Sequence, residues 1–197
     1  MNADDDMEIT LPILRLIEQK SDITQRSLAK QLGLALGLTN SYLKYCINKG
    51  LVKIEQIPAN RYLYYLTPKG FAEKSRLTAE FLTRSFHFYR QASASCFHLF
   101  KRCLSQGYKE AILCGVSDLT DIALLQASRT EVQVLGIYDP SCEHDLHLKY
   151  QVWHEMKAPL EHAVFVITAL NAPKRMRIQL QQTIDDSRVV APDILSL

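Results

Sequence analysis

The stretch ITQRSLAKQLGLALGLTNSYLKYCINKGLVK, residues 23–53, decides the fold of the N-terminal half of the chain. Thr24 is a suitable N-cap for a short helix, because its hydroxyl can accept from a backbone N–H of the first turn. Gly33 then favours a turn, and apolar residues recur at helical spacing from there to a second glycine, Gly50. Two short helices joined by a tight glycine turn predict a helix-turn-helix, whose second helix can enter the major groove of DNA. A plain helical hairpin would give the same pattern.

The residues after Gly50 favour the first of these two interpretations. From Leu51 the apolar pattern switches to period two over residues 51–55, and it does so again over 62–66. The residues Pro58–Asn60 between these segments favour a turn, with Arg61 beside the tip. We therefore predict a β-hairpin directly after the helix-turn-helix, which is the arrangement of a winged helix.

Two segments, SLAKQLGLALGLTNSYLKYCINKGLVK (27–53) and YLTPKGFAEKSRLTAEFL (65–82), resemble the MarR-like winged-helix regulators, most closely the branch called EPS-associated transcriptional regulators. The resemblance covers roughly residues 9–90, somewhat under half of the chain. It implies double-stranded DNA as a partner. It also implies DNA contacts from the positioning helix, the start of the second helix and the wing, which fall on Arg26, Gly37, Asn40, Ser41, Lys44, Lys53 and Arg61.

The chain departs from the family pattern at the start of the second helix. Ala35 stands where a serine usually caps this helix, and such a cap contributes about 1 kcal/mol. Leu38 stands where a lysine is common. Asn40 could still hydrogen-bond an adenine edge, and Lys44 could bind a guanine edge or a phosphate. The alternative for both side chains is simple exposure to solvent.

The charge of the chain is unevenly distributed. The net charge is +2, yet residues 9–106 carry 15 Lys and Arg against 5 Asp and Glu. Residues 107–197 carry 8 against 12. This division predicts phosphate attraction in the first part and a different role for the second.

The composition indicates a cytoplasmic protein. No apolar run approaches the roughly eighteen residues of a membrane span, and the acidic N-terminus is unlike a signal peptide. The five cysteines form no C-x-x-C pair. Four of them lie in apolar stretches, so we interpret them as small hydrophobic residues in a reducing compartment.

A long helical pattern runs from the end of the wing to about Gln106. On it, apolar and small residues repeat in heptad steps, which is typical of a helix that packs against another helix. Related regulators dimerise through such helices, so we predict a homodimer. The alternative is a helix that crosses the core of its own chain. The repeat consists of Leu82, Phe86, Tyr89, Ser93, Cys96, Phe100 and Cys103.

In the second half, nearly continuous apolar runs alternate with helical segments. We expect strands at 111–116, 132–138, 163–167 and 188–190, with helices at 118–128 and 173–185. Strands of this kind predict a buried parallel sheet with right-handed crossovers. The half is similar to small Rossmann-type nucleotide-binding modules.

In such folds a ligand binds beyond the carboxyl ends of the strands, where the strand order reverses. The expected lining here is Gly115, Val116, Ser117, Asp118, Asp139, Thr168 and Asn171. Asp139 follows the second strand, where a ribose-binding acid would stand. The G-x-G-x-x-G motif is absent, however, and Asp118 would repel a pyrophosphate. A small anionic or nucleotide-like ligand and a domain that only mediates assembly both remain open.

The sequence indicates neither an enzyme nor a metal site. Gly115-Val116-Ser117 begins a G-x-S-x-G nucleophile motif, but Leu119 replaces its second glycine. The spacing of Cys142, His144 and His147 matches no common zinc site. We therefore expect no catalytic residue and no metal, and the cofactor is unknown.

The predicted fold is an α+β winged helix-turn-helix (1–68), a long linking and dimerisation helix (69–106), and a small α/β Rossmann-like domain with a parallel sheet (107–197). The predicted function is that of a homodimeric DNA-binding transcriptional regulator whose second half senses a small ligand or mediates assembly. Two alternatives remain: a protein–protein adaptor with a vestigial winged helix, in which Ala35 and Leu38 form an apolar docking face, and a nucleotide-binding enzyme module.

Overall fold

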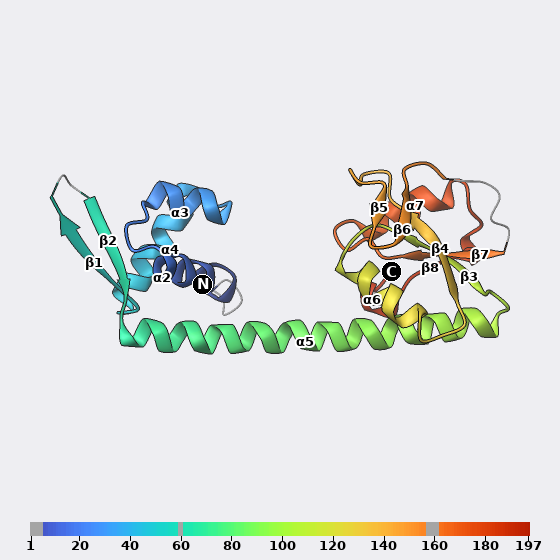
Figure 1. The fold of residues 1–197 in the computed structure, drawn as a ribbon, viewed down its shortest axis with the longest axis horizontal. Coiled ribbons are helices and arrows are strands. Elements are labelled where there is room, and N and C mark those ends of the chain that lie inside the picture. The colour runs from blue at the N-terminus through green and yellow to red at the C-terminus, as the bar shows by residue number, and fades with distance from the viewer. Residues whose placement is uncertain (1–5, 59–60, 157–161) are drawn as a thin grey trace. The chain divides into compact units, whose positions relative to one another are not determined.

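The computed structural model describes residues 6–58, 61–156 and 162–197 (Figure 1). The chain forms two compact units, Met1–Ser85 and Phe86–Leu197. The long helix α5 (Pro68–Ser105) begins in the first unit and ends in the second. Each unit is described by itself below.

The first unit begins with a π-helical turn at Asp6–Thr10 that leads into α2 (Leu11–Gln19). The helix-turn-helix follows as α3 (Gln25–Leu32) and α4 (Leu36–Asn48). The Thr24 hydroxyl accepts from the Ser27 N–H at 3.1 Å, which confirms the predicted N-cap. Gly33 has a φ of +64° and ends α3 in the left-handed region, which glycine adopts at little cost.

The wing consists of β1 (Val52–Ile57) and β2 (Arg61–Leu66), which pair antiparallel from Val52–Leu66 to Ile57–Arg61. Two hydrogen bonds attach the wing to the segment before α3 and to the first residue of α3. The Tyr64 N–H donates to the Ser21 carbonyl at 2.8 Å, and the Gln25 amide donates to the Tyr64 hydroxyl at 3.3 Å. The expected hairpin is thus present, while Ala59 and Asn60 of its expected turn lie outside the described residues.

The core of the first unit forms where one apolar side of each helix packs beneath the wing. Ile13 and Leu14 of α2, Leu28 of α3 and Leu43 of α4 are almost completely buried. Leu77 brings α5 into the same core. The Lys74 ammonium of α5 also forms an ion pair with the Glu18 carboxylate of α2. Because α3 and α4 bury these faces, their opposite faces are left for solvent.

The second unit contains a mainly parallel sheet. Its strands are β3 (Glu110–Cys114), β4 (Gln133–Tyr138), β5 (Leu146–His147), β6 (Tyr150–Trp153), β7 (Ala163–Ile167) and β8 (Val189–Val190). Over the described residues their order is β5-β6-β4-β3-β7-β8. The pairs β3–β4, β3–β7, β4–β6 and β7–β8 are parallel, and β5–β6 is antiparallel. The order reverses at β3, because the chain continues first to β4 on one side and later to β7 on the other.

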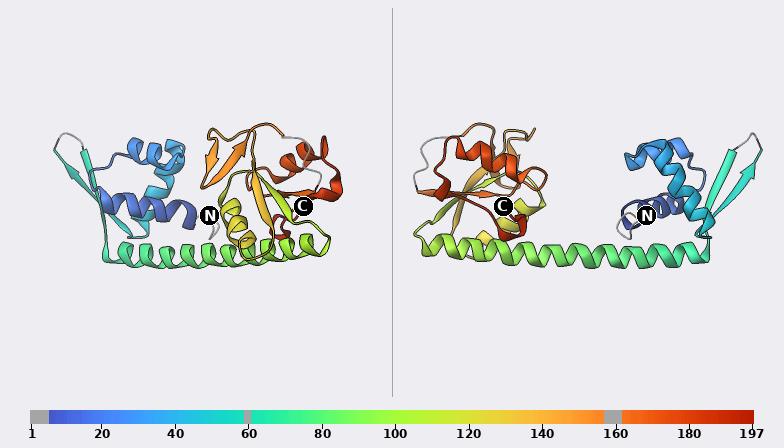
Figure 2. Two further views of the ribbon diagram at one scale, coloured as in Figure 1. Left: turned by 45° about the vertical axis from the view of Figure 1, so that its right-hand side comes forward. Right: turned by 180° about the vertical axis from the view of Figure 1, so that it is seen from behind.

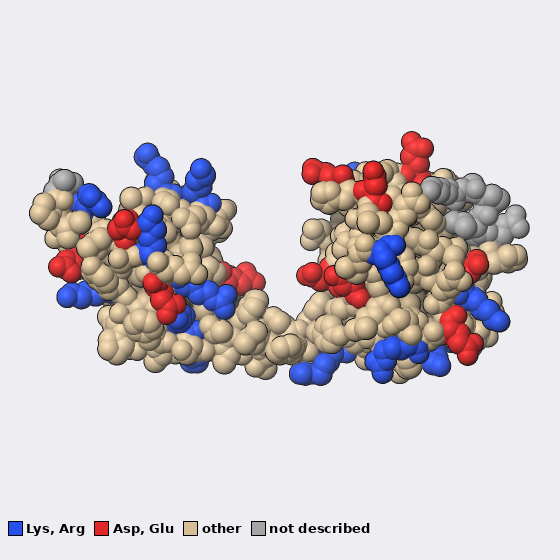
Figure 3. Space-filling view, in the orientation of Figure 1, with Lys and Arg blue, Asp and Glu red and all other residues tan. Residues whose placement is uncertain are grey.

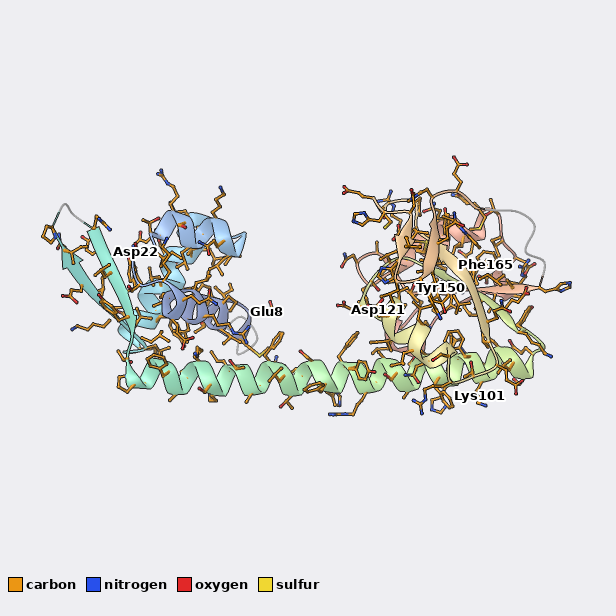
Figure 4. All side chains as sticks on the ribbon, viewed as in Figure 1. Glu8, Asp22, Lys101, Asp121, Tyr150 and Phe165 are labelled. Carbon is orange, nitrogen blue, oxygen red and sulfur yellow. The ribbon has the colours of Figure 1, made fainter. Side chains whose placement is uncertain are left out.

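Helices cover both faces of this sheet, which explains why its strands are apolar throughout. Val164 and Val166 of β7 pack with α6 (Asp118–Ala127) and the end of α5. Phe165 and Ile167 face the other way, into a core with Met176 of α7 (Pro173–Gln181). Figure 2 shows the sheet between α7 and the other two helices. The Phe165 side chain is labelled within the unit in Figure 4.

Several sequence expectations need correction. The helix expected at 173–185 ends at Gln181, and Asp186–Arg188 form a 3-10 turn instead. The stretch from Cys142 to His147, expected to be a loop, ends in the short strand β5, which forms an unexpected hairpin with β6. The sequence did not indicate this hairpin, because strands of two and four residues are too short to show a hydrophobic period.

The heptad repeat on α5 divides into two parts. Leu82, Phe86 and Tyr89 are 41% to 58% exposed. Cys96 and Phe100 are completely buried in the core of the second unit, and Cys103 is 1% exposed. The last three positions pack inside their own chain, so only the exposed part of the repeat is left for the predicted partner helix. The interpretation of four cysteines as buried hydrophobic residues is confirmed, because Cys46, Cys96, Cys103 and Cys114 are buried.

Candidate functional site

One side of α4 is open to solvent. Gly37, Leu38, Ser41 and Lys44 are all exposed. Thr39, Tyr42, Leu43 and Cys46 are buried on the other side. The Ser41 hydroxyl donates to the Gly37 carbonyl at 3.0 Å, so its remaining capacity is to accept. Lys44 is exposed and forms no hydrogen bond or ion pair within the described residues, which leaves its ammonium free for a phosphate or a guanine edge.

The position of Asn40 differs from the expected outward orientation. Its side chain is half-buried, and its Oδ1 atom is buried without a hydrogen-bond partner among the described residues. Asn40 follows the fully buried Thr39, so it lies at the flank of α4 rather than on the exposed edge. A buried, unpaired amide oxygen costs free energy, and because this atom is buried, any contact of Asn40 with a ligand would use the amide nitrogen.

The start of α4 has no side-chain cap. Ala35 is its N-cap residue and forms no capping hydrogen bond, as its methyl side chain dictates. The exposed first turn instead carries two apolar side chains, Leu36 at 42% and Leu38 at 43% exposure. The free N–H groups of this turn point toward any anion placed at the helix start.

Two predicted contact residues lie around one hollow in the first unit. Arg26, on α3, and Arg61, at the start of β2, line a hollow of about 370 Å³ together with Leu36, Tyr62 and Tyr64. The structure thus brings the positioning helix, the start of α4 and the wing together on one surface. Lys53 is exposed on β1. Figure 3 shows Lys and Arg side chains projecting from the region of α3 in this unit.

The second unit has a cavity of about 230 Å³ at the carboxyl ends of β3, β4 and β7. It lies where the strand order reverses, which is the usual ligand position in such sheets. Of the seven predicted residues, Val116, Ser117, Asp139 and Asn171 line it. Gly115, Asp118 and Thr168 do not.

Gly115 and Thr168 instead hold the cavity floor together. The Gly115 carbonyl accepts from the hydroxyls of Thr120 at 2.5 Å and Thr168 at 2.6 Å. Gly115 has a φ of +104°, and a Cβ there would lie 2.5 Å from the Cβ of Ala169. A larger residue would therefore force the ends of β3 and β7 apart.

Ser117 and Asp139 are also already hydrogen-bonded. The Ser117 hydroxyl donates to the Thr168 carbonyl at 2.6 Å and accepts from the Leu119 N–H, which caps α6. The Asp139 carboxylate accepts from the N–H of Val116 at 2.8 Å and from the N–H and hydroxyl of Ser141. Burial acts to raise the pKa of Asp139, but these hydrogen bonds outweigh it and lower the pKa below its ordinary value.

The sequence interpretation missed Arg175, which lines the same cavity from the first turns of α7. Arg175 has no hydrogen bond or ion pair with any residue in the described part of the chain. The signal that could have located it was the start of the helix after the third long strand, because that helix end faces the same edge of the sheet.

The histidines near β5 contact carboxylates. His147 Nε2 lies 2.6 Å from Asp121 Oδ1 of α6, and His154 Nε2 lies 2.8 Å from Asp145 Oδ1. Figure 4 labels Asp121 on α6. Within residues 6–58, 61–156 and 162–197, no group of three or more His, Cys, Asp or Glu could hold a metal ion. No helix in those ranges is long and apolar enough to cross a membrane.

One family model matches part of the first unit. A family model described as winged helix-turn-helix DNA-binding matches residues 8–53, which contain α2, α3 and α4. The chain therefore has a winged helix-turn-helix at its N-terminus, followed by a long helix and an α/β region with a mostly parallel sheet.

The solved structures similar to the chain include two MarR-type proteins. One is the MarR family protein Rv2887 of Mycobacterium tuberculosis in complex with p-aminosalicylic acid, at 21% identity over 49% of this chain and 74% of that chain, with a TM-score of 0.37. The other is MepR, a transcription regulator of the Staphylococcus aureus multidrug efflux pump MepA, at 22% identity over 52% of this chain and 75% of that chain, with a TM-score of 0.39. No curated protein matches the chain.

Proposed function

We propose that the protein is a cytoplasmic, MarR-like, sequence-specific DNA-binding transcriptional regulator that acts as a homodimer. The observation that carries this proposal is the exposed face of α4 in a winged helix-turn-helix, with Lys44 unpaired on it. A second helix of this kind docks in the major groove, where its first turns meet base edges and phosphates. The proposed DNA contacts are Arg26, Gly37, Asn40, Ser41, Lys44, Lys53 and Arg61.

These residues have different roles in the proposal. Arg26, Lys53 and Arg61 are exposed cations on three elements, so they bind phosphates and fix the orientation of the unit on the duplex. Lys44 and Asn40 lie at the groove-facing side and flank of α4. The Oδ1 atom of Asn40 is buried, so the base contact proposed for this residue is a hydrogen bond that its Nδ2 amide donates, as to adenine N7.

The proposed dimer uses the exposed part of α5. Every residue from 81 to 90 is exposed, and five of them are large apolar residues. A helix segment this apolar gains free energy by covering that surface. A second copy is the partner expected for a winged helix that binds a two-fold operator. The apolar residues are Phe81, Leu82, Phe86, Phe88 and Tyr89.

The second unit completes the proposal. Its cavity, at the switch in strand order, is the place where a small ligand would be sensed, and assembly is the alternative role for this unit. A ligand that prefers one dimer geometry would change the spacing of the two recognition helices by a shift in population. No catalytic residue is proposed in either unit.

The test begins with selection of a binding site from a random pool of duplex DNA, using the full chain. Lys44→Ala is then expected to weaken binding of the selected site and to reduce the salt slope by about one, because one phosphate or guanine contact is lost. Asn40→Ala is expected to cost about 1–3 kcal/mol and to relax preference at one base pair. Gel-shift titrations at several salt concentrations measure both effects.

Lys149→Ala, which removes a cation from the second unit, is the control and is expected to bind like the wild type. If the pool yields no selected sequence, the protein is not a sequence-specific regulator. If a sequence is selected but both α4 variants bind it normally, another surface contacts the DNA.

The second candidate function, a protein–protein adaptor, is favoured by the exposed Leu36 and Leu38 at the start of α4. In an adaptor these side chains would contact an apolar partner rather than a DNA groove. The Leu38→Lys variant separates the two functions, since it adds a cation to the same turn. It would strengthen DNA binding by a regulator but would weaken an apolar docking surface.

A further inference from the structure

We propose that the cavity of the second unit binds a small hydroxylated organic anion, with Arg175 as the residue that holds the anionic group. This proposal rests on the ligand-sensing role proposed above for the second unit. It adds the chemical class of the ligand and a binding residue that the sequence did not indicate.

The first step of the argument is the position of the cavity. It is open at the carboxyl edge of the sheet, between the loop after β4 and the loop after β7, and these two strands lie on opposite sides of β3. Its volume of about 230 Å³ lies just below the roughly 300–1,000 Å³ of typical ligand pockets. This space suits a small metabolite and is too small for a dinucleotide.

The second step is that the floor is rigid before any ligand arrives. The hydroxyls of Thr120 and Thr168 both donate to the Gly115 carbonyl, and Ser117 joins β7 to the start of α6. These groups use their donors within the protein. They hold the shape of the cavity and leave recognition to other side chains, which lowers the ordering cost of binding.

The third step is the charge that remains unpaired. Arg175 lines the cavity and, within the described ranges, contacts no carboxylate. A guanidinium offers a planar set of donors that matches a carboxylate or a phosphate in a bidentate manner. The uncapped N-terminus of α7 reinforces this preference, because Ala172 provides no side-chain cap and the first N–H groups of the helix favour an anion.

The fourth step concerns the rest of the ligand. The Asp139 carboxylate lines the same cavity and is 7% exposed. Oδ1 already accepts from the N–H and hydroxyl of Ser141, but Oδ2 accepts only from the Val116 N–H and keeps a lone pair for a further donor. A hydroxyl of the ligand can donate there, and Asn171 offers both a donor and an acceptor at the rim. The site therefore fits a sugar phosphate or a hydroxy acid, which share this chemistry.

The experiment uses the full chain labelled with nitrogen-15 and three probes: glucose 6-phosphate, gluconate and glucose. At least one of the two anions is expected to shift the backbone amide signals of Val116, Ser141 and Asn171, whereas neutral glucose shifts none of them. Arg175→Gln is expected to weaken the anion by roughly tenfold or more, since a charge-assisted hydrogen bond is lost. Lys174→Gln is the matched control, because it removes a charge from the same helix turn without lining the cavity.

Three results would overturn the proposal. One is the absence of any shift at these amides with either anion up to about 50 mM, well above a Kd of ~1 mM. The second is equal binding of glucose and the anions. The third is equal loss of binding in Arg175→Gln and Lys174→Gln, which would indicate only nonspecific attraction. DNA binding by the first unit is measured separately on the same variants, so failure here is distinguishable from failure of the regulator proposal.

Discussion

Gly70 lies in the first turn of α5, where the helix passes over the end of α4 and the start of the wing. A Cβ at this position would lie 2.0 Å from the carbonyl oxygen of Leu51. That oxygen already accepts from the Thr67 N–H at 3.0 Å, and the Gly70 N–H donates to the Thr67 hydroxyl. The close approach therefore involves backbone atoms that are fixed by hydrogen bonds.

We predict that Gly70→Ala lowers the free energy of unfolding of the first unit by about 2 kcal/mol or more, because the backbone must move to admit the methyl group. Gly37→Ala is the control. It also lies in a helix, but nothing is within 4 Å of its added Cβ, so it is expected to stabilise α4 by about 0.5–1 kcal/mol. Urea unfolding followed by circular dichroism compares the variants. A Gly70→Ala variant that is no less stable than the wild type would contradict the close packing against Leu51.

Asp139 links the ends of β3 and β4 through hydrogen bonds that only its ionised form fully satisfies. Its pKa is lowered in the folded protein from an ordinary value of 3.8, because these hydrogen bonds outweigh the opposing effect of burial. A carboxyl group with a lowered pKa contributes stability that is present above the unfolded pKa and is lost as the pH falls through the folded pKa.

We therefore predict that Asp139→Asn destabilises the second unit at pH 7 and that the difference from wild type shrinks as the pH falls below about 4. Trp153 is the single tryptophan of the chain and lies in the core of this unit, so its fluorescence during urea unfolding reports the transition. A difference that stays constant from pH 7 to pH 3 would show that the carboxylate is not stabilised by its three donors.

At the scale of elements, α5 has two different surroundings along one face. The C-terminal part of α5 packs into the core of the second unit, where Cys96 and Phe100 are fully buried. Burial raises the pKa of the Cys96 thiol to about 12, which keeps it protonated and unreactive at neutral pH. The preceding segment continues the same heptad steps with exposed Leu82 and Phe86. This segment is where a second copy can bind without competing with the core.

We predict that the double variant Leu82→Glu, Phe86→Glu converts a dimer to a monomer, because two charges per chain would be buried in the helix pair. Sedimentation equilibrium measures the mass, and circular dichroism checks that the fold is retained. His87→Glu adds a charge on another side of the same exposed segment and is expected to remain dimeric. A monomeric wild type at micromolar concentration would remove the basis of this prediction.

At the scale of the whole molecule, charge separates the two halves. Residues 9–106 have a surplus of basic side chains and residues 107–197 a surplus of acidic ones. Figure 3 shows acidic side chains at the surface of the second unit around β5 and β6. We therefore expect the basic half to attract phosphate and the acidic half to add nothing to DNA affinity.

We predict that DNA affinity falls steeply as salt rises. If Arg26, Lys44, Lys53 and Arg61 bind phosphates in both copies of a dimer, the slope of log K against log salt is about −7. Fluorescence anisotropy over a series of potassium chloride concentrations measures it. The full chain is used for this test. A slope near zero, or no binding at any salt, would favour the adaptor function instead.

The elements of the fold were largely predictable because they depend on local chemistry. Gly33 and Gly50 ended helices in the left-handed region, and Thr24 capped α3. The period-two run after Gly50 became the wing, and the apolar runs of the second half became parallel strands covered on both faces. The family match to residues 8–53 supports the winged-helix assignment made from the same residues.

The candidate sites were less predictable, since they depend on contacts between distant residues. The repeat on α5 could not reveal that Phe100 packs under a sheet while Phe86 is exposed, because both positions share one helical face. The outward set on α4 included Asn40, whose oxygen is in fact buried. Of the seven residues predicted at the sheet edge, four line the cavity, Gly115 and Thr168 build its floor, and Asp118 does not line it.

The amino-acid sequence by itself determined a winged helix-turn-helix, a long helix and a parallel sheet, because hydrophobic period, caps and glycine turns act over a few neighbouring residues. Only the tertiary structure decided which polar groups are still free to bind. Hydrogen bonds from Val116 and Ser141 occupy Asp139, while Arg175, far along the chain, meets the same cavity without a partner in the described ranges. Chain folding brings these groups together, and no local pattern records which of them become paired.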